Sequence, residues 1–241
     1  ICVPSEASEV EKRAVMDAAR NSGAKVVHLI EEPLAAAIGA GLDITKPDGC
    51  MIVDIGGGTC DVAVISLGGV VVRSSIKIAG DKFDEAIIKY VRSQYKIMIG
   101  EKTAEQIKIG IGSAVDGLRN EEMIIKGRNL VTGLPDELKL TSAEITKALK
   151  EPVRLIVESV KSVLEKTPPE ISADIMDKGI LMTGGGSLLY GLDKLIESET
   201  GVTVNVAENS IEAVAEGTGA VLAYIDKLDK VVNDQEIVLV E

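Results

Sequence analysis

The spacing of apolar and polar residues along the chain predicts an α/β fold. Residues 50–66 contain two short apolar runs on either side of a glycine turn, and a third run follows over residues 70–78. Runs of this kind, bounded by glycine, are typical of strands, and we expect these three to form an antiparallel meander. Segments with apolar residues three or four apart predict helices between the strands, including one that begins at Gly80 and ends at Tyr95.

Capping signals indicate where two further helices begin. Residues 8–11 and 141–144 each have the pattern of a capping box, in which a Ser or Thr is followed three residues later by Glu. They predict helices over residues 9–21 and 142–165. Pro152 lies inside the second of these, so we expect a kink or a break there.

The rest of the pattern is consistent with alternating strands and helices. It predicts strands over residues 25–30, 179–183 and 202–206, and helices over residues 34–40, 103–113, 187–199 and 211–228. Residues 115–140 are rich in charge and glycine, and we expect them to form short strands and turns in a small subdomain.

The composition narrows the class of function. Of the 241 residues, 46% are hydrophobic and only 2% aromatic, so we expect an aliphatic core like that of α/β proteins with buried strands. The formal net charge of −12 argues against a nucleic-acid partner and against a basic patch that docks on anionic lipid. The three cysteines lack the spacing of metal ligands and favour a reducing compartment, so we expect a cytoplasmic protein.

The sharpest chemical signal is residues 54–59, which are Asp, Ile, three glycines and Thr. Successive glycines after a strand let backbone N–H groups turn toward an oxyanion, and Asp54 in front of them is placed to hold Mg²⁺. The segment therefore predicts a phosphate clamp with a metal ion, and a plain glycine hairpin is the alternative. It is neither a Walker loop nor a dinucleotide fingerprint, because it lacks Gly-Lys-Ser/Thr and leads into a strand.

A second glycine turn, residues 183–187, lies between a predicted strand and a predicted helix. At such a position the N–H groups of the helix can meet the anionic or polar edge of a ligand. Alone, the turn is as consistent with a packing device. Together, the two triple-glycine turns predict two walls of one nucleotide cleft.

Several polar residues leave a structural and a functional interpretation open. Glu31 and Glu32 either stabilise the start of the helix that follows or place a carboxylate beside a water at the phosphate loop. Thr59 likewise either stabilises its turn or holds that water. Glu105 and Lys108 lie three residues apart on a predicted helix, where a solvated ion pair is the simpler interpretation.

The motifs together resemble the second phosphate loop and the adenosine loop of the actin and heat-shock chaperone ATPase superfamily. Within it, the chain is similar to the MreB and Mbl family of bacterial actins. The segments that carry the resemblance are residues 30–39, 54–59, 79–81, 132–135, 164–170 and 182–191. The resemblance covers about residues 1–228 and implies an actin-like ATPase fold, with ribonuclease H-like lobes around a cleft for ATP and Mg²⁺.

The resemblance also implies roles for individual residues. Glu32 matches the catalytic acid of the family, which with Thr59 positions the hydrolytic water, and Asp54 lies near the metal. The residues that it implies for the nucleotide are Gly56, Gly57, Gly58 and Thr59 at the β- and γ-phosphates, Glu105 and Lys108 at the nucleoside, and Gly184, Gly185, Gly186, Ser187, Leu188 and Leu189 at the adenosine pocket.

The same resemblance divides the chain into parts of two lobes. It assigns residues 1–47 to the end of the first lobe, 48–95 and 149–209 to the core of the second lobe, 96–148 to its small subdomain, and 210–228 to a helix that returns to the first lobe. Residues 229–241 receive no role. The first phosphate loop and most of its lobe, including a membrane-binding segment, have no counterpart, and the chain begins on an apolar run without Met. We therefore expect a fragment of a longer protein.

The implied function is that of a rod-shape-determining protein. Such a protein binds and hydrolyses ATP, polymerises into membrane-associated filaments and scaffolds cell-wall synthesis. Its expected partners are further copies of itself and membrane proteins of cell shape and cell-wall elongation. Half a cleft is expected to bind ATP weakly, so the alternative is a non-catalytic lobe that binds only filament and adaptor surfaces. A chaperone-type ATPase is disfavoured, because about a dozen residues after Leu228 leave no room for a peptide-binding domain.

Overall fold

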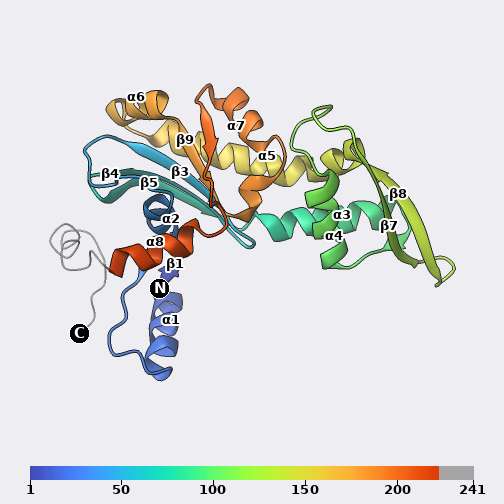
Figure 1. The fold of residues 1–241 in the computed structure, drawn as a ribbon, viewed down its shortest axis with the longest axis horizontal. Coiled ribbons are helices and arrows are strands. Elements are labelled where there is room, and N and C mark those ends of the chain that lie inside the picture. The colour runs from blue at the N-terminus through green and yellow to red at the C-terminus, as the bar shows by residue number, and fades with distance from the viewer. Residues whose placement is uncertain (223–241) are drawn as a thin grey trace.

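The computed structural model describes residues 1–222 and shows three β-sheets with helices packed against them (Figure 1). The end of the helix predicted over residues 211–228, and residues 229–241 after it, lie outside the described part. Within the described part, no helix has both the length and the apolar character that a membrane span requires.

The elements follow in the order strand, helix, strand, helix and then the predicted meander. The strands are β1 (Cys2–Val3), β2 (Ile30–Glu31), β3 (Cys50–Ile55), β4 (Cys60–Ser66), β5 (Gly69–Ile76), β6 (Ile97–Met98), β7 (Glu122–Asn129), β8 (Pro135–Thr141), β9 (Ile180–Thr183) and β10 (Val204–Val206). The helices are α1 (Glu9–Asn21), α2 (Glu32–Gly39), α3 (Gly80–Tyr95), α4 (Glu101–Ile111), α5 (Ser142–Lys166), α6 (Pro169–Lys178), the 3₁₀ helix η1 (Gly185–Leu188), α7 (Leu192–Thr200) and α8 (Ala213–Leu222).

The central sheet has five strands in the order β10-β9-β3-β4-β5. The predicted antiparallel meander is confirmed, because β3 pairs with β4 and β4 pairs with β5 in antiparallel fashion. On its other side β3 pairs in parallel with β9, which in turn pairs in parallel with β10. This arrangement brings the two glycine turns, which follow β3 and β9, to the same end of two neighbouring strands.

Alternate residues of the central strands point to opposite faces of the sheet, as the pleat requires. On one face, Val53 and Ile55 of β3 join a large aliphatic core with residues of α3, α5 and α7. On the other face, Ile52 packs with Ala36 and Ala37 of α2. The α2 face therefore has small side chains, which let this helix lie close to the sheet.

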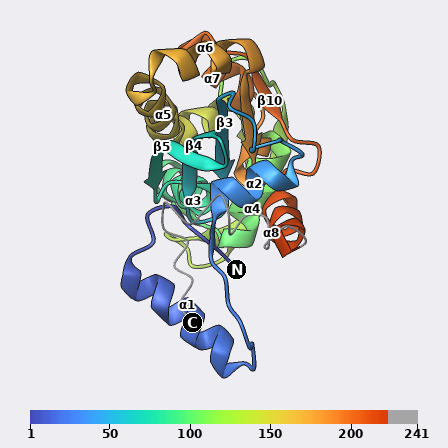
Figure 2. The same ribbon diagram turned by 90° about the vertical axis from the view of Figure 1, so that its left-hand side faces the viewer.

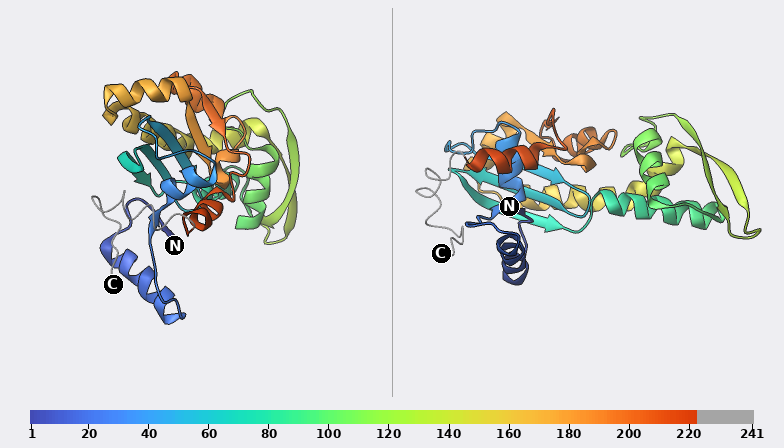
Figure 3. Two further views of the ribbon diagram at one scale, coloured as in Figure 1. Left: turned by 60° about the vertical axis from the view of Figure 1, so that its left-hand side comes forward. Right: turned by 60° about the horizontal axis from the view of Figure 1, so that its bottom comes forward.

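A second, three-stranded sheet lies away from the central one. It is antiparallel, in the order β6-β7-β8. Helices α3 and α5 run side by side from the central sheet out to it, which gives the molecule its elongated shape (Figures 1 and 3). The β7–β8 hairpin confirms the short strands expected in residues 115–140.

The strand predicted over residues 25–30 is wrong for most of its length. Only Ile30 is in a strand, β2, and Val26 is 71% exposed. A strand must pair its backbone N–H and C=O groups with a neighbour, and β1 pairs with β2 through two residues, Cys2 and Val3. Helix α1 projects away from the rest of the molecule (Figure 2).

Both predicted capping boxes are confirmed. The side chains of Ser8 and Thr141 accept from the backbone N–H groups of Glu11 and Glu144, whose carboxylates bond back to the cap residues. Of the kink or break expected at Pro152, the break does not occur, because α5 is helical from residue 142 to 166. Pro152 is buried on the core side of the helix, so packing along its 25 residues outweighs the hydrogen bond that proline cannot donate.

Helices α2 and α8 cross at very close range on the α2 face of the sheet (Figures 1 and 2). A Cβ atom built on Gly39 would lie 1.8 Å from the carbonyl oxygen of Ala213, and one built on Gly217 would lie 1.8 Å from that of Ala35. Each helix thus offers two small residues four apart, which lie on one helix face. The crossing requires glycine at both contact points.

We predict that Gly217→Ala destabilises the protein by about 1–3 kcal/mol, because the added methyl group meets backbone atoms that cannot rotate away. Gly219→Ala is the matched control on the same helix, since no atom lies within 4 Å of its added Cβ. Alanine is the better helix former, so that control should stabilise by up to about 1 kcal/mol. Chemical denaturation of both variants measures the difference, and equal stabilities would contradict the close crossing.

Candidate functional site

A row of polar residues crosses the central sheet at the end where the glycine turns lie. In the strand register Thr183 of β9 lies beside Asp54 of β3, Asp54 opposite Asp61 of β4, and Asp61 opposite Ser75 of β5. Residues paired in this way point to the same face. That face is the one covered by α2, because Ile52 and its neighbours on the same side pack against that helix.

Asp54 is held in a buried position. Its side chain is 5% exposed and its Oδ1 accepts a hydrogen bond of 2.8 Å from the hydroxyl of Thr183. Burial raises the pKa of Asp54 to about 6, while the bond from Thr183 opposes this shift and the nearby Asp61 adds to it. The carboxyl is therefore poised between its two protonation states near neutral pH.

Asp61 is buried more completely than Asp54. It is fully buried, and its Oδ1 accepts a hydrogen bond of 2.9 Å from the backbone N–H of Ser5. Its Oδ2 has no hydrogen-bond partner among residues 1–222. A buried carboxylate oxygen without a donor is costly, so this atom is available to a water or ligand that enters the site.

Glu32 approaches these two carboxyls from the first turn of α2. Burial and the negative charges of Asp61 and Asp54 raise the pKa of Glu32 to about 7, against the opposing effect of the nearby Thr59 hydroxyl. Three acidic groups from three elements thus lie within electrostatic reach of one another. Neither Glu31 nor another side chain caps α2 by a hydrogen bond at its N-cap. The two glutamates therefore make no capping hydrogen bond, while Glu32 still lies in the first turn, where a negative charge suits the helix dipole.

The first glycine turn connects this cluster to the start of α3. The N–H of Gly56 bonds to the carbonyl of Thr59 at 2.9 Å, and the carbonyls of Gly56 and Gly57 accept from Gly80 and Asp81 at 3.1 and 2.8 Å. The turn is thus fixed by its carbonyl groups.

The amide groups of the turn remain free for a ligand. Within residues 1–222 the N–H groups of Gly57 and Gly58 have no acceptor, and both residues are exposed. No atom lies within 4 Å of a Cβ built on Gly58. Adjacent free N–H groups at an open turn form the kind of concavity that binds anions.

Lys108 lies close to the same turn but does not pair with Glu105. Its ammonium donates to Asp84 at 2.9 Å and to the carbonyl of Gly80 at 3.3 Å. Burial raises the pKa of Asp84, while Lys108 opposes that shift. The simple ion pair expected between Glu105 and Lys108 is replaced by this contact, and Glu105 is exposed to solvent.

The second glycine turn packs closely against β3. Gly184 has φ +80°, and a Cβ on it would lie 2.2 Å from the carbonyl oxygen of Ile55. A Cβ on Gly186 would lie 2.4 Å from the Ile55 side chain. Ser187 is buried, and its hydroxyl bonds to the carbonyl of Gly184 at 2.6 Å.

The residues predicted for an adenosine pocket thus separate into two groups. Leu188 is 55% exposed and Gly185 is also exposed, so these two are free to contact a ligand. Leu189 is 6% exposed and belongs to the aliphatic core, together with its neighbour Leu192. The buried side of the turn consists of Gly184, Gly186 and Ser187.

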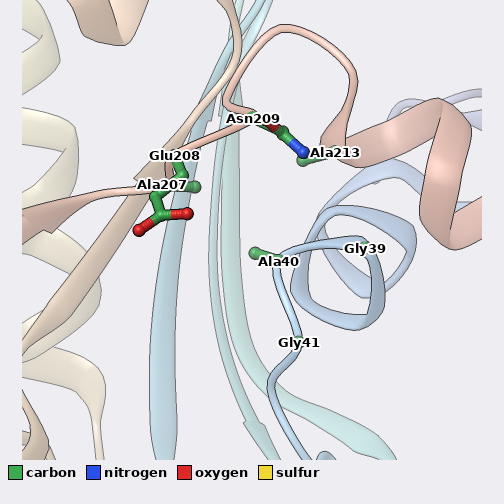
Figure 4. Close-up of a pocket in the computed structure, with 7 residues that line it drawn as sticks. All are labelled: Gly39, Ala40, Gly41, Ala207, Glu208, Asn209 and Ala213. Atoms are coloured by element: carbon green, nitrogen blue, oxygen red, sulfur yellow. The ribbon is translucent and has the colours of Figure 1, made fainter.

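A pocket of about 280 Å³ lies between the C-terminal end of α2 and the loop from β10 to α8 (Figure 4). Its lining residues are Gly39, Ala40, Gly41, Ala207, Glu208, Asn209 and Ala213. Because Glu32 lies at the other end of α2, this pocket is separate from the carboxylate cluster.

The donor set fits a magnesium ion that is held mainly by a nucleotide and water. Mg²⁺ takes oxygen ligands and usually keeps several waters, so one or two protein carboxylates suffice. Asp54 offers such a carboxylate, and the free Oδ2 of Asp61 lies beside it in the strand register. Residues 1–222 contain no group of three or more His, Cys, Asp or Glu arranged to hold a metal by themselves.

The sequence interpretation missed Asp61, Thr183 as a partner of Asp54, and Asp84. For Asp61 a signal was available: it ends the same glycine turn, and antiparallel pairing about that turn places it opposite Asp54. Thr183 required knowledge that β9 pairs with β3, and Asp84 required the packing of α3 on α4.

Known proteins with a similar sequence are cell shape-determining proteins of bacteria. The family model for the MreB/Mbl protein matches residues 1–230. The chain is 53% identical over 230 residues to the cell shape-determining protein Mbl of Bacillus cereus, covering 95% of this chain and 69% of that protein. It is also 53% identical over 226 residues to the cell shape-determining protein MreB of Escherichia coli, covering 94% of this chain and 65% of that protein.

Solved structures agree with the sequence relatives. MreB5 of Spiroplasma citri bound to AMPPNP superimposes with a TM-score of 0.90 at 43% identity, covering 95% of this chain and 69% of that chain. MamK in a double helical filament gives a TM-score of 0.77 at 21% identity, with 92% and 69% covered, and supports the fold alone. The predicted actin-like fold is thus confirmed, and the chain belongs to the MreB/Mbl family.

Proposed function

We propose that this chain supplies the second phosphate loop and the catalytic acid of a protein that binds ATP with Mg²⁺ and hydrolyses it. The Spiroplasma relative has been crystallised with AMPPNP and with ADP, which supports a nucleotide as the ligand. The observation that carries the proposal is the pair of free N–H groups of Gly57 and Gly58, in the same turn as Thr59, whose hydroxyl lies near Glu32.

In this proposal the phosphates lie on the first glycine turn. The N–H groups of Gly57 and Gly58 bind their oxygens without bringing positive charge into the site, which suits an acidic chain. Mg²⁺, when bound with the nucleotide, offsets the negative charge of the phosphates. Asp54, oriented by Thr183, is the protein carboxylate that would hold it.

Glu32 acts on the attacking water. A carboxyl with a pKa of about 7 accepts a proton at neutral pH and returns it readily. The hydroxyl of Thr59, near Glu32, gives the water a second point of attachment. The residues thus contribute mainly by positioning, as in other phosphoryl transfers.

The rest of the site belongs to the first lobe, of which residues 1–47 and 210–228 are the proposed parts present here. The first phosphate loop would come from that lobe. The proposed cellular role is assembly into membrane-associated filaments that organise cell-wall synthesis from the cytoplasmic side. The cell shape-determining relatives Mbl and MreB support this role. Cell-wall elongation proteins of the membrane are the proposed further partners.

A non-catalytic lobe, which retains only surfaces for filament and adaptor contacts, is the second candidate. The burial of Gly184, Gly186 and Ser187 supports it, because these residues pack closely against β3.

Isothermal titration of the 241-residue chain with ATP and Mg²⁺ separates the two candidates. Because Gly57, Gly58 and Leu188 remain exposed, we predict measurable binding, weakened by the incomplete cleft. The control is the same titration without Mg²⁺, which should bind more weakly. Absence of heat in both titrations would favour the non-catalytic lobe.

We predict that Glu32→Gln, made in the complete protein with its first lobe, lowers the rate of phosphate release by about 10²–10⁴-fold. The amide cannot accept the proton of the water, and general base catalysis typically contributes this factor. Nucleotide affinity should change little, because the proposed phosphate ligands are the free amides rather than Glu32. Glu158→Gln, on the exposed side of α5, is the matched control and should retain full turnover. Unchanged turnover in Glu32→Gln would refute the assignment.

The raised pKa values also predict how stability depends on pH. A carboxyl whose pKa is higher in the folded state than in the unfolded state binds protons preferentially when folded, so its contribution to stability falls as pH rises. For Glu32 and Asp54 this window runs from about pH 4 to about pH 7. Without nucleotide, Glu32→Gln should therefore be more stable than the wild type at pH 7.5, by a margin that shrinks toward pH 4.5. Urea denaturation at several pH values tests this, and a margin that grows toward acid pH would contradict it.

A further inference from the structure

Glu31 and Glu32 are adjacent in sequence but reach in different directions. Glu31 is the N-cap residue of α2, yet its side chain makes no capping hydrogen bond. Its carboxylate instead pairs with the guanidinium of Arg73 on β5. Glu32, the next residue, lies near Thr59 at the glycine turn. The two acids thus attach the start of α2 to two different places on the central sheet.

The strand register explains why Arg73 reaches α2. In the central sheet Ile52 of β3 lies opposite Ala63 of β4, and Ala63 lies opposite Arg73 of β5. Ile52 and Ala63 pack with α2 in the second core cluster, so Arg73 is the polar end of an otherwise apolar row beneath this helix. Strand β5 is the edge strand of this sheet. From there the side chain of Arg73 reaches Glu31 at the N-terminal end of α2.

The ion pair between Glu31 and Arg73 is partly buried. The side chain of Glu31 is 22% exposed, against 47% for that of Arg73. The second carboxylate oxygen of Glu31, Oε2, is buried and has no partner in residues 1–222. A carboxylate in this environment depends on its one cation, since an unpaired charge would have to turn outward to reach water. Movement of Glu31 would also move the backbone that carries Glu32.

We propose that Arg73 is a positioning residue: by holding Glu31, it fixes the first turn of α2 and keeps Glu32 against Thr59. The proposal rests on the hydrolytic function proposed above for its catalytic consequence, but its structural part stands without it. Within residues 1–222 Arg73 makes no hydrogen bond to Glu32 or to the glycine turn, so it acts through Glu31.

Two neighbouring contacts fix the segment before α1 to the same two strands. The backbone N–H of Ser5 donates to Asp61 on β4, and the N–H of Ser75 on β5 donates to Glu6 at 3.4 Å. These bonds hold the loop after β1, whereas the Arg73 contact holds the start of α2. Loss of Arg73 should therefore loosen α2 without releasing the N-terminal segment.

The first test measures α2 directly. We expect Arg73→Ser in the 241-residue chain to raise amide hydrogen exchange about 10-fold or more in a peptide that covers residues 30–39, with α5 unchanged. Glu31→Gln should give the same pattern, and Arg73→Lys should restore part of the protection. Arg154→Ser is the matched control: Arg154 is 48% exposed and pairs with Glu151 and Glu158 on its own helix.

The second test measures catalysis in the complete protein with its first lobe. Because a small misplacement of a catalytic group can cost up to about 100-fold, we expect Arg73→Ser to lower kcat about 10-fold while KM for ATP changes less than about 2-fold. A merely structural role would instead lower the melting temperature and leave kcat of the folded protein unchanged.

The outcomes separate this proposal from the proposed function. Unaltered exchange over residues 30–39 in Arg73→Ser would overturn the positioning role, whatever the ATPase activity. Faster exchange in that variant, with a wild type that does not hydrolyse ATP, would support the positioning role and refute the proposed function. Faster exchange with an unchanged kcat would overturn the catalytic consequence.

Discussion

Helix α2 packs tightly between the central sheet and α8, and this packing sets the positions of the site residues. Alanines on one side of the helix meet the sheet, and Gly39 meets the backbone of α8. With both sides fixed, the helix has little freedom to slide or rotate. Its first turn therefore delivers Glu31 and Glu32 to defined places, one at the edge strand and one above the row of buried carboxyls.

The site contains buried carboxyl groups that lower the stability of the fold. Asp54 and Asp61 are buried beside each other, and one oxygen of Asp61 lacks a partner. The aliphatic core on the opposite face of the sheet compensates for this cost, with Val53 and Ile55 fully buried directly beside Asp54 in sequence. Period-two alternation of the strand thus separates the stabilising side chains from the chemical ones, and a turn rich in glycine leaves amides free next to them.

Much of the fold could be predicted because its signals are local. The capping boxes at Ser8 and Thr141 mark their helices correctly, and glycine turns mark the meander. The predictions that differ from the structure share a different cause. The run at residues 25–30 depends on a strand partner, and the helix at Pro152 depends on packing along its whole length. In both cases contacts distant in sequence outweigh the local preference.

For the site, residue types along the chain indicate the chemistry: an acidic residue followed by three glycines and Thr59, and a glutamate where a helix begins. Residue type and turn geometry suffice for that, because both are set within a few residues. Tertiary structure alone decided which groups meet. Pairing of β9 with β3 places Thr183 beside Asp54. Packing of α3 against α4 places Lys108 beside Asp84 rather than Glu105. The position of β5 places Arg73 beside Glu31. These pairings span 129, 24 and 42 residues, distances over which local sequence carries no information about contact.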